Sequence, residues 1–112
     1  MIEADVRDYL LTKVNVPVYL DAPKVTPNAY IKVFRNGTSG TRFLESALFT
    51  FHCIASTLLE SAALSEQLKE AMYDMPSVPK ISKVELNAET DWTDTATREY
   101  RYQSVYEITY HR

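Results

Sequence analysis

The sequence has a single cysteine, Cys53, and no long apolar segment. One cysteine cannot form an intramolecular disulfide, so the composition is not that of a secreted scaffold held together by disulfides. No stretch approaches the roughly 20 apolar residues that span a bilayer, and residues 1–15 carry charges where a secretory signal has an apolar run. We therefore expect a cytoplasmic product without membrane contact, in which the Asn36-Gly37-Thr38 sequon is only a turn.

A basic surplus is lacking too, because 12 Lys+Arg stand against 15 Asp+Glu and the net charge is −3. Nucleic-acid-binding proteins normally carry a basic patch or surplus, since contacts to phosphates supply much of their affinity. The composition therefore disfavours specific binding of nucleic acid. The apolar share of 46% is that of a folded globular protein, and 112 residues is the length of one domain, so a single domain is expected over residues 1–112.

The first elements can be predicted from the hydrophobic period along the chain. A short N-terminal helix is indicated by apolar residues at helical spacing: Ile2, Val6, Tyr9 and Leu10. Residues 16–21 predict a brief strand. Pro17 places that strand at a sheet edge, or itself at the strand start, because proline cannot donate to a central ladder.

A long hairpin is predicted next, with two strands joined by residues 35–42. This connection holds both glycines of the chain, Gly37 and Gly40, which marks it as the place where positive φ is needed. The strand after it alternates between two faces. One face is formed by Ala47, Phe49, Phe51, Cys53 and Ala55, and the other by Leu48, Thr50, His52 and Ile54.

A second, longer helix follows, because Thr57 and Glu60 have the spacing of a capping box and Pro76 and Pro79 end the helical pattern. Its apolar stripe consists of Leu64, Leu68, Ala71, Met72 and Met75. Two strands, joined by the polar loop at residues 90–97, complete the chain. In the first of them the alternation predicts one shared face for Val84, Leu86 and Ala88. The predicted fold class is α+β: a mostly antiparallel sheet with long hairpins, one short N-terminal helix and one longer central helix packed on the sheet.

The last strand has aromatic side chains on its even positions. Tyr100, Tyr102, Tyr106 and Tyr110 would present ~600 Å² of surface, at the upper end of what a soluble monomer exposes in one patch. At ~3.3 Å per residue this strand would reach ~45 Å, which exceeds the diameter of a compact domain of this length, so it either bends at bulges or projects as an arm. The helices can cover the middle of the aromatic face, and a neighbouring subunit can cover a projecting end; both interpretations stay open.

The sequence predicts neither an enzyme nor a metal or cofactor site. His52 and Cys53 are neighbours on a strand and point to opposite faces, so they cannot act together as base and nucleophile. Glu89, Asp91 and Asp94 could bind a hard cation, but they lack the spacing of a calcium loop, so a solvated acidic loop is the favoured interpretation.

The candidate contacts with a partner lie at the hairpin tips and on the aromatic strand. Trp92 either folds back onto its own core or anchors a partner, since tryptophan and arginine are enriched among interface hot spots. The full set of candidates is Arg35, Asn36, Thr38, Arg42, Trp92, Asp94, Tyr100 and Tyr102. An alternative function is single-stranded nucleic-acid binding, in which bases would stack on aromatic side chains beside basic ones: Arg98, Tyr100, Arg101 and Tyr102.

The order of these elements resembles a known family. With a strand at "VPVYLD", a hairpin around "RNGTSGTR", a central helix "TLLESAALSEQLKEAMYDM" and the end "YRYQSVYEITYH", the chain resembles the small tail-completion proteins of long-tailed bacteriophages. These include tail terminators and tail-to-head joining proteins. The resemblance implies a homo-oligomeric ring, usually of six subunits, that joins through sheets and extended loops. It also implies two partners, the tail tube protein and the head connector protein, and a place in the tail or neck of the virion after synthesis in the bacterial host cytoplasm.

Overall fold

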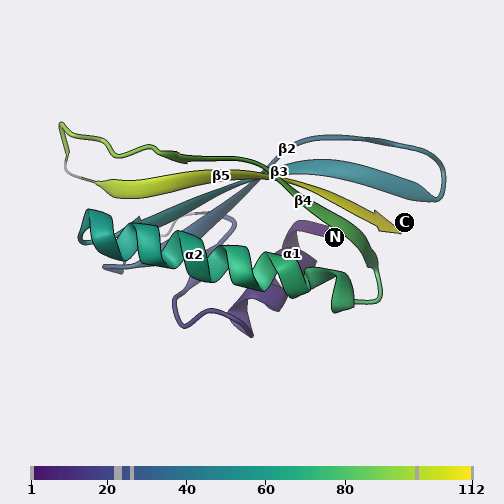
Figure 1. The fold of residues 1–112 in the computed structure, drawn as a ribbon, viewed down its shortest axis with the longest axis horizontal. Coiled ribbons are helices and arrows are strands. Elements are labelled where there is room, and N and C mark those ends of the chain that lie inside the picture. The colour runs from purple at the N-terminus through teal and green to yellow at the C-terminus, as the bar shows by residue number, and fades with distance from the viewer. Residues whose placement is uncertain (1, 22–23, 26, 98, 112) are drawn as a thin grey trace.

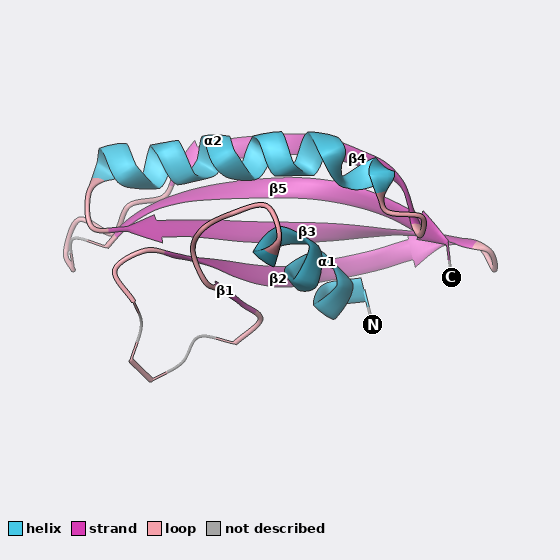
Figure 2. Ribbon diagram, turned by 90° about the horizontal axis from the view of Figure 1, so that it is seen from below, coloured by secondary structure: helices cyan, strands magenta, loops and turns pink. Residues whose placement is uncertain are grey.

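The computed structural model describes residues 2–21, 24–25, 27–97 and 99–111. The elements are α1 (Ile2–Leu11), β1 (Val18–Tyr19), β2 (Tyr30–Gly40), β3 (Leu44–Ala55), α2 (Leu58–Asp74), the 3-10 turn η1 (Met75–Ser77), β4 (Ile81–Asp91) and β5 (Tyr100–His111). They form one sheet in the order β1-β2-β3-β5-β4, with β1 parallel to β2 and the other neighbours antiparallel. Both helices lie on the same face of this sheet (Figure 1; Figure 2). The α+β prediction is therefore confirmed.

The N-terminal helix α1 buries an apolar stripe against the sheet, as its sequence predicts. Ile2, Val6 and Leu10 are buried on one stripe of α1, and acidic residues occupy its first turn, where the helix dipole favours negative charge. The Tyr9 hydroxyl donates a 2.6 Å hydrogen bond to the Ala71 carbonyl of α2. The two helices are thereby joined across the face of the sheet.

The short strand β1 lies at one edge of the sheet, as Pro17 predicts. Pro17 stands just before β1, and its carbonyl accepts a 2.9 Å hydrogen bond from the Ile31 backbone N–H of β2. Because proline has no N–H to donate, its place at the start of an edge strand leaves no ladder donor missing. The rest of the outer edge of β2 runs past the end of β1.

The hairpin between β2 and β3 is longer than the sequence predicts, and its predicted turn is wrong. Residues 35–40 belong to β2, and the connection is residues 41–43. The ladder shifts register between Arg35 and Gly37, where an extra residue forms a bulge and the strand continues. Only one of the described glycines, Gly40, has a positive φ, of 141°. A turn was predicted at Gly37 because it is a glycine, but Gly37 lies within β2, directly after the bulge.

The central helix begins and ends close to the predicted positions. Thr57 is the N-cap, and its hydroxyl accepts a 3.1 Å hydrogen bond from the Glu60 backbone N–H. The helix ends at Asp74, and Pro76 then lies in the short turn η1. All five predicted apolar positions are buried, although the last of them lies in η1: Leu64, Leu68, Ala71, Met72 and Met75.

The strand β4 is the other edge of the sheet, and it changes phase along its length. Its pairing with β5 shifts register between Ile81 and Lys83 and again between Leu86 and Ala88. Each shift inserts one residue, so the residues after it face the opposite side. Ala88 is therefore opposite Val105 and out of phase with Leu86, which corrects the sequence prediction.

The core lies between α1, α2 and the helix-covered face of the sheet. The predicted inward residues of β3 are all buried, and the Phe51 ring meets the Tyr106 ring edge-on at 5.6 Å between centroids. On β5, Tyr106 and Tyr110 are buried, whereas Tyr100 and Tyr102 are partly exposed. The helices of the same chain therefore cover the middle and the C-terminal part of the aromatic face.

The long strands give the molecule its shape. The structure measures 44 × 26 × 24 Å, and at ~3.3 Å per residue the 12 residues of β5 span ~40 Å. The hairpin end extends past the helices (Figure 1), and every residue from 35 to 44 is exposed. We call residues 35–44 the arm. Within the described residues, neither helix has the length and apolar character needed to cross a membrane.

Candidate interaction surface

The predicted contact residues lie in two groups at opposite ends of the sheet. The arm carries Arg35, Asn36, Thr38 and Arg42, while the β4–β5 connection and the start of β5 carry Trp92, Asp94, Tyr100 and Tyr102. Leu44 pairs with His111 at one end of the β3–β5 ladder, and Ala55 pairs with Tyr100 at the other. The two hairpin tips therefore point away from each other along the long axis (Figure 1). The set forms two surfaces and not one site.

The arm is held at its base and free at its tip. Arg35 Nη1 lies 3.5 Å from Glu3 Oε1 of α1, and Asn36 Oδ1 accepts a 2.6 Å hydrogen bond from the Thr50 hydroxyl. At the tip the Arg42 guanidinium lies 5.8 Å from the centroid of the Phe43 ring, whose side chain is 74% exposed. Phe43 is not among the predicted contact residues, because it directly follows the connection predicted to end at Arg42.

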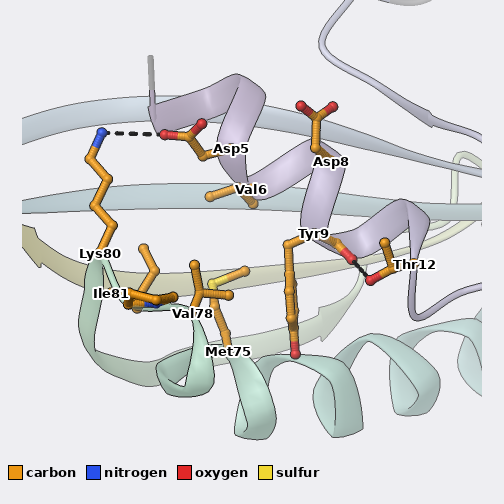
Figure 3. Close-up of a pocket in the computed structure, with 10 residues that line it drawn as sticks. Asp5, Val6, Asp8, Tyr9, Thr12, Met75, Val78, Lys80 and Ile81 are labelled. Atoms are coloured by element: carbon orange, nitrogen blue, oxygen red, sulfur yellow. Dashed lines mark hydrogen bonds and ion pairs between the residues drawn. The ribbon is translucent and has the colours of Figure 1, made fainter.

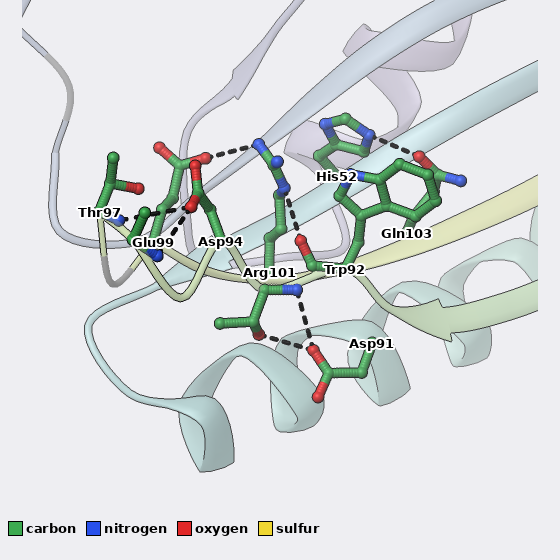
Figure 4. Close-up of polar contacts among 10 residues, drawn as sticks. His52, Asp91, Trp92, Asp94, Thr97, Glu99, Arg101 and Gln103 are labelled. Atoms are coloured by element: carbon green, nitrogen blue, oxygen red, sulfur yellow. Dashed lines mark hydrogen bonds and ion pairs between the residues drawn. The ribbon is translucent and has the colours of Figure 1, made fainter.

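At the opposite tip, formed by the β4–β5 connection, the polar side chains bond to other groups of the same tip (Figure 4). Asp94 Oδ1 accepts hydrogen bonds from the backbone N–H groups of Thr97 and Ala96, and the bonds from Thr97, followed by that from Ala96, lower the pKa of Asp94. Arg101 donates to the Trp92 carbonyl at 2.9 Å and to Glu99 at 2.7 Å. These side chains therefore stiffen the connection and leave few charges for a partner.

The acidic residues of this region do not converge on a cation. The Glu89 carboxylate accepts a 2.7 Å hydrogen bond from Ser65 of α2, whereas Asp91 accepts from the hydroxyl of Thr93 at 2.6 Å and Asp94 turns toward its own loop. Over the described ranges, no group of three or more His, Cys, Asp or Glu side chains is placed to hold a metal ion. The predicted acidic loop is correct only for Asp94, because Glu89 and Asp91 lie in β4 and the Glu89 side chain bonds to Ser65 and Lys69 of α2.

The aromatic and basic residues of β5 lie on opposite faces of the sheet. Tyr102 is the partner of Cys53 on the helix-covered face, while Arg101 is the partner of Ile54 and points to the other side. A base stacked on Tyr100 or Tyr102 could therefore not also contact Arg101 on the same surface. The predicted Arg98 lies outside the described residues. This geometry does not favour a nucleic-acid platform.

His52 and Cys53 occupy different environments, as their alternation predicts. His52 Nε2 lies 2.9 Å from Gln103 Oε1, and partial burial is the main cause that lowers the pKa of the ring. Cys53 is buried on the helix-covered face, where burial and then the Glu89 carboxylate raise the pKa of its thiol to about 12. A thiol in that state is not an activated nucleophile.

The face of the sheet opposite the helices carries a shallow hollow of about 730 Å³. Its lining mixes apolar and polar side chains from three strands: Phe34, Leu48, Thr50, His52, Gln103 and Val105. The Phe34 and His52 rings meet edge-on at 5.0 Å between centroids, so an aromatic pair lies at the centre of this hollow. We call this face of the sheet the open face, because the described helices lie on the other side (Figure 2).

A second hollow, of about 590 Å³, lies between α1 and the segment that joins α2 to β4 (Figure 3). Its inner surface is apolar and contains Val6, Met75, Val78 and Ile81. Charged side chains form its rim, where Lys80 Nζ lies 3.3 Å from Asp5 Oδ2 and Asp8 stands one helical turn further along. We call it the α1 groove. The sequence does not predict this groove, because it arises only when α1 packs beside η1.

No protein-family model matches this chain, and no curated protein matches it either. Function must therefore be argued from the geometry. The described residues offer a projecting arm, an acidic hairpin tip, an open sheet face and an apolar groove, all of which are suited to contacts between macromolecules.

Proposed function

We propose that this chain is a virion structural protein of a long-tailed phage or prophage, which assembles into a ring on the tail tube. The ring, usually of six subunits in the family that the sequence resembles, would end polymerisation of the tube and mediate attachment of the tail to the head connector. In this proposal the protein acts by contact alone, without catalysis, metal, cofactor or specific nucleic acid. It would work in the tail or neck of the virion after synthesis in the host cytoplasm.

The observation that carries the proposal is the arm. From residue 35 to residue 44 every side chain is exposed, and the tip presents the aromatic ring of Phe43 to solvent. A hairpin that leaves its own core buries little of its own apolar surface, so an isolated domain gains little stability from it. Extended arms of this kind are stabilised when they pack on another molecule.

The two ends of the molecule support assembly into a closed ring. A ring requires two different surfaces on each subunit, because every subunit must contact one neighbour with one surface and the next neighbour with another. The arm and the β4–β5 tip differ in chemistry and lie at opposite ends of a body 44 Å long. Such a subunit can contact one neighbour through the arm and leave the β4–β5 tip, the open face or its loops for other contacts.

The test is capping of tail tubes. Purified tube protein of the same phage is polymerised with and without this chain, and tube lengths and tube ends are measured by electron microscopy. The expected result is a ring at one end of each tube and arrest of growth at an amount of one ring per tube. Tubes that grow to the same length with bare ends, together with a failure to bind the connector, would contradict the proposal.

A further inference from the structure

The tip of the arm combines an exposed aromatic ring with a positive charge. Phe43 is 74% exposed, so its ring is not seated in a hollow of its own chain, and the Arg42 guanidinium lies 5.8 Å from the ring centroid. The next residue, Leu44, is also partly exposed. The tip therefore has the composition of an interface anchor, in which an aromatic ring and an arginine supply most of the binding energy.

The α1 groove has the complementary composition. Its apolar interior is of a size that holds a large side chain, and Met75 adds a sulfur atom that can pack favourably against an aromatic ring. Its rim carries two carboxylates, those of Asp5 and Asp8, against the one ammonium group of Lys80. Lys80 pairs with Asp5, and the Asp8 carboxylate pairs only with the adjacent Arg7, which does not line the groove.

The Asp8 carboxylate can be reached by a partner. Its side chain is 65% exposed, and its 3.1 Å contact is with the adjacent Arg7, an exposed pair of the kind that contributes little stability. An incoming guanidinium could bind this carboxylate through two parallel hydrogen bonds. Asp8 is among the residues that line the groove, and its carboxylate points away from Met75 and Val78, so a guanidinium would reach it at the outer rim (Figure 3).

The β4–β5 tip and the open face fit the arm less well. At the β4–β5 tip the carboxylates of Asp91, Asp94 and Glu99 accept hydrogen bonds from their own loop or pair with Arg101. The hollow of the open face is lined in part by the base of the arm itself, at Arg35 and Asn36. The α1 groove joins an apolar interior, which includes Met75, to the exposed carboxylate of Asp8.

We propose that the α1 groove receives the arm of a second copy of this chain, with Phe43 in the groove and Arg42 against Asp8. The contact joins two different surfaces, so each bound subunit leaves one arm and one groove free, and repetition closes a ring or a reciprocal pair according to the rotation between subunits. This inference rests on the self-assembly in the proposed function and adds the surfaces that carry it.

The first experiment is a charge exchange followed by sedimentation. Arg42→Glu and Asp8→Lys are each expected to weaken self-association on the order of tenfold or more, because each places two like charges together at the contact. The double variant Arg42→Glu/Asp8→Lys is expected to recover most of the loss. Both positions are exposed, so the urea unfolding midpoints should match that of the wild type.

The second experiment tests the aromatic anchor against a matched residue. Phe43→Ala is expected to weaken self-association on the order of tenfold or more, whereas Leu59→Ala should leave it unchanged. Leu59 is the control because it is equally apolar and 81% exposed, but it lies at the start of α2, away from the arm and the groove. Equal effects of the two substitutions would overturn the assignment of Phe43 as the anchor.

The third experiment traps the contact between two chains. Cys53 is buried, so the wild-type background offers no exposed thiol among the described residues. A Thr41→Cys chain, which keeps Arg42 and Phe43 at the exposed tip, is mixed with a Val78→Cys chain under mild oxidation, and a mixture with Leu59→Cys in place of Val78→Cys is the control. The expected result is a disulfide-linked heterodimer that forms in the first mixture and much more slowly in the control. Equal yields would overturn the inference.

The outcomes separate this inference from the proposed function. A wild-type chain that stays monomeric at all concentrations and on tubes, or rings that survive Arg42→Glu and Phe43→Ala unchanged, would overturn the arm-in-groove contact. In the second case capping of tubes would still stand. Conversely, chains that assemble through the groove but never cap a tube would support the contact and overturn the tail function.

Discussion

The Ser65 hydroxyl of α2 donates a 2.7 Å hydrogen bond to the Glu89 carboxylate of β4. The same carboxylate lies 3.4 Å from Lys69 Nζ, so α2 is joined by two polar contacts to the edge strand. Removing a buried hydroxyl that bonds to a carboxylate costs about 1 kcal/mol or somewhat more. Ser65→Ala should lower the free energy of unfolding in urea by that amount. Ser39→Ala, on the exposed arm, is the control and should change it by less than about 0.5 kcal/mol.

Two buried tyrosines on the same strand should respond oppositely to loss of their hydroxyls. The Tyr110 hydroxyl donates a 2.6 Å hydrogen bond to Glu45, whereas the buried Tyr106 hydroxyl has no partner among the described residues. Tyr110→Phe should therefore lower the free energy of unfolding by about 1–2 kcal/mol. Tyr106→Phe should leave it unchanged or raise it by up to about 1 kcal/mol. Urea titration of both variants checks the pair, and a clear loss in Tyr106→Phe would refute the expectation.

The two glycines of the arm should differ in their tolerance of a side chain. A Cβ on Gly40 would collide with the Leu44 carbonyl oxygen and lie 2.7 Å from Glu45 Cα, at a φ of 141° that favours glycine. Gly40→Ala should therefore destabilise the chain by about 1–3 kcal/mol. A Cβ on Gly37 meets no described atom within 4 Å, so Gly37→Ala should stay within about 0.5 kcal/mol of the wild type. Similar losses at both positions would mean that the turn is placed differently.

The Cys53 thiol should be inert in the native protein. Burial, and then the charge of Glu89, raise its pKa from 9.0 to about 12, so almost no thiolate forms at pH 8. Labelling by a disulfide reagent at pH 8 should be slow in buffer and immediate in denaturing urea. Fast labelling without denaturant would show that the core opens around this strand.

The same shift predicts the direction of alkaline destabilisation. Above pH 9 the unfolded chain releases the thiol proton while the folded chain keeps it, so stability is fully present below that pH and is lost as the pH rises toward about 12. Burial also raises the pKa of Tyr9, Tyr106 and Tyr110, which adds loss in the same direction. Urea midpoints at pH 8 and pH 10.5 measure it, and an equal midpoint at both values would refute it.

The sequence predicted best the elements whose burial depends on a local period. The alternation along β3 placed every second residue from Ala47 to Ala55 on the buried face, as the structure shows. The helical spacing in α2 identified the buried stripe of that helix. Both signals are contained in a few neighbouring residues, so no knowledge of partner strands was needed. The N-cap at Thr57 was predicted for the same reason.

The errors concern features that depend on pairing between strands. The bulge after Arg35 carries β2 past Gly37, and the bulge after Leu86 turns Ala88 to the other face. A bulge is defined by the register of the partner strand, which the residues of one strand do not encode clearly. The turn at residues 35–42 and the phase of Ala88 were therefore predicted wrongly.

The candidate surface was predicted only in part. The hairpin tips were chosen for their polar and aromatic residues, and their separation to opposite ends follows from the sheet order, which the sequence analysis did not predict. The α1 groove was missed because its lining comes from α1, η1 and the start of β4, which are far apart along the chain. The exposure of Phe43 depends on how far the arm extends beyond the helices.

The two irregularities of β4 have a consequence for how copies of this chain can add to one another. An outer strand with evenly spaced free amides would let molecule after molecule add side by side into a fibre of no fixed length. Here the regular spacing is broken twice, and Lys83 and Glu85 pair at 2.7 Å on the exposed strand. Strand-by-strand addition of another molecule along this edge is thereby discouraged.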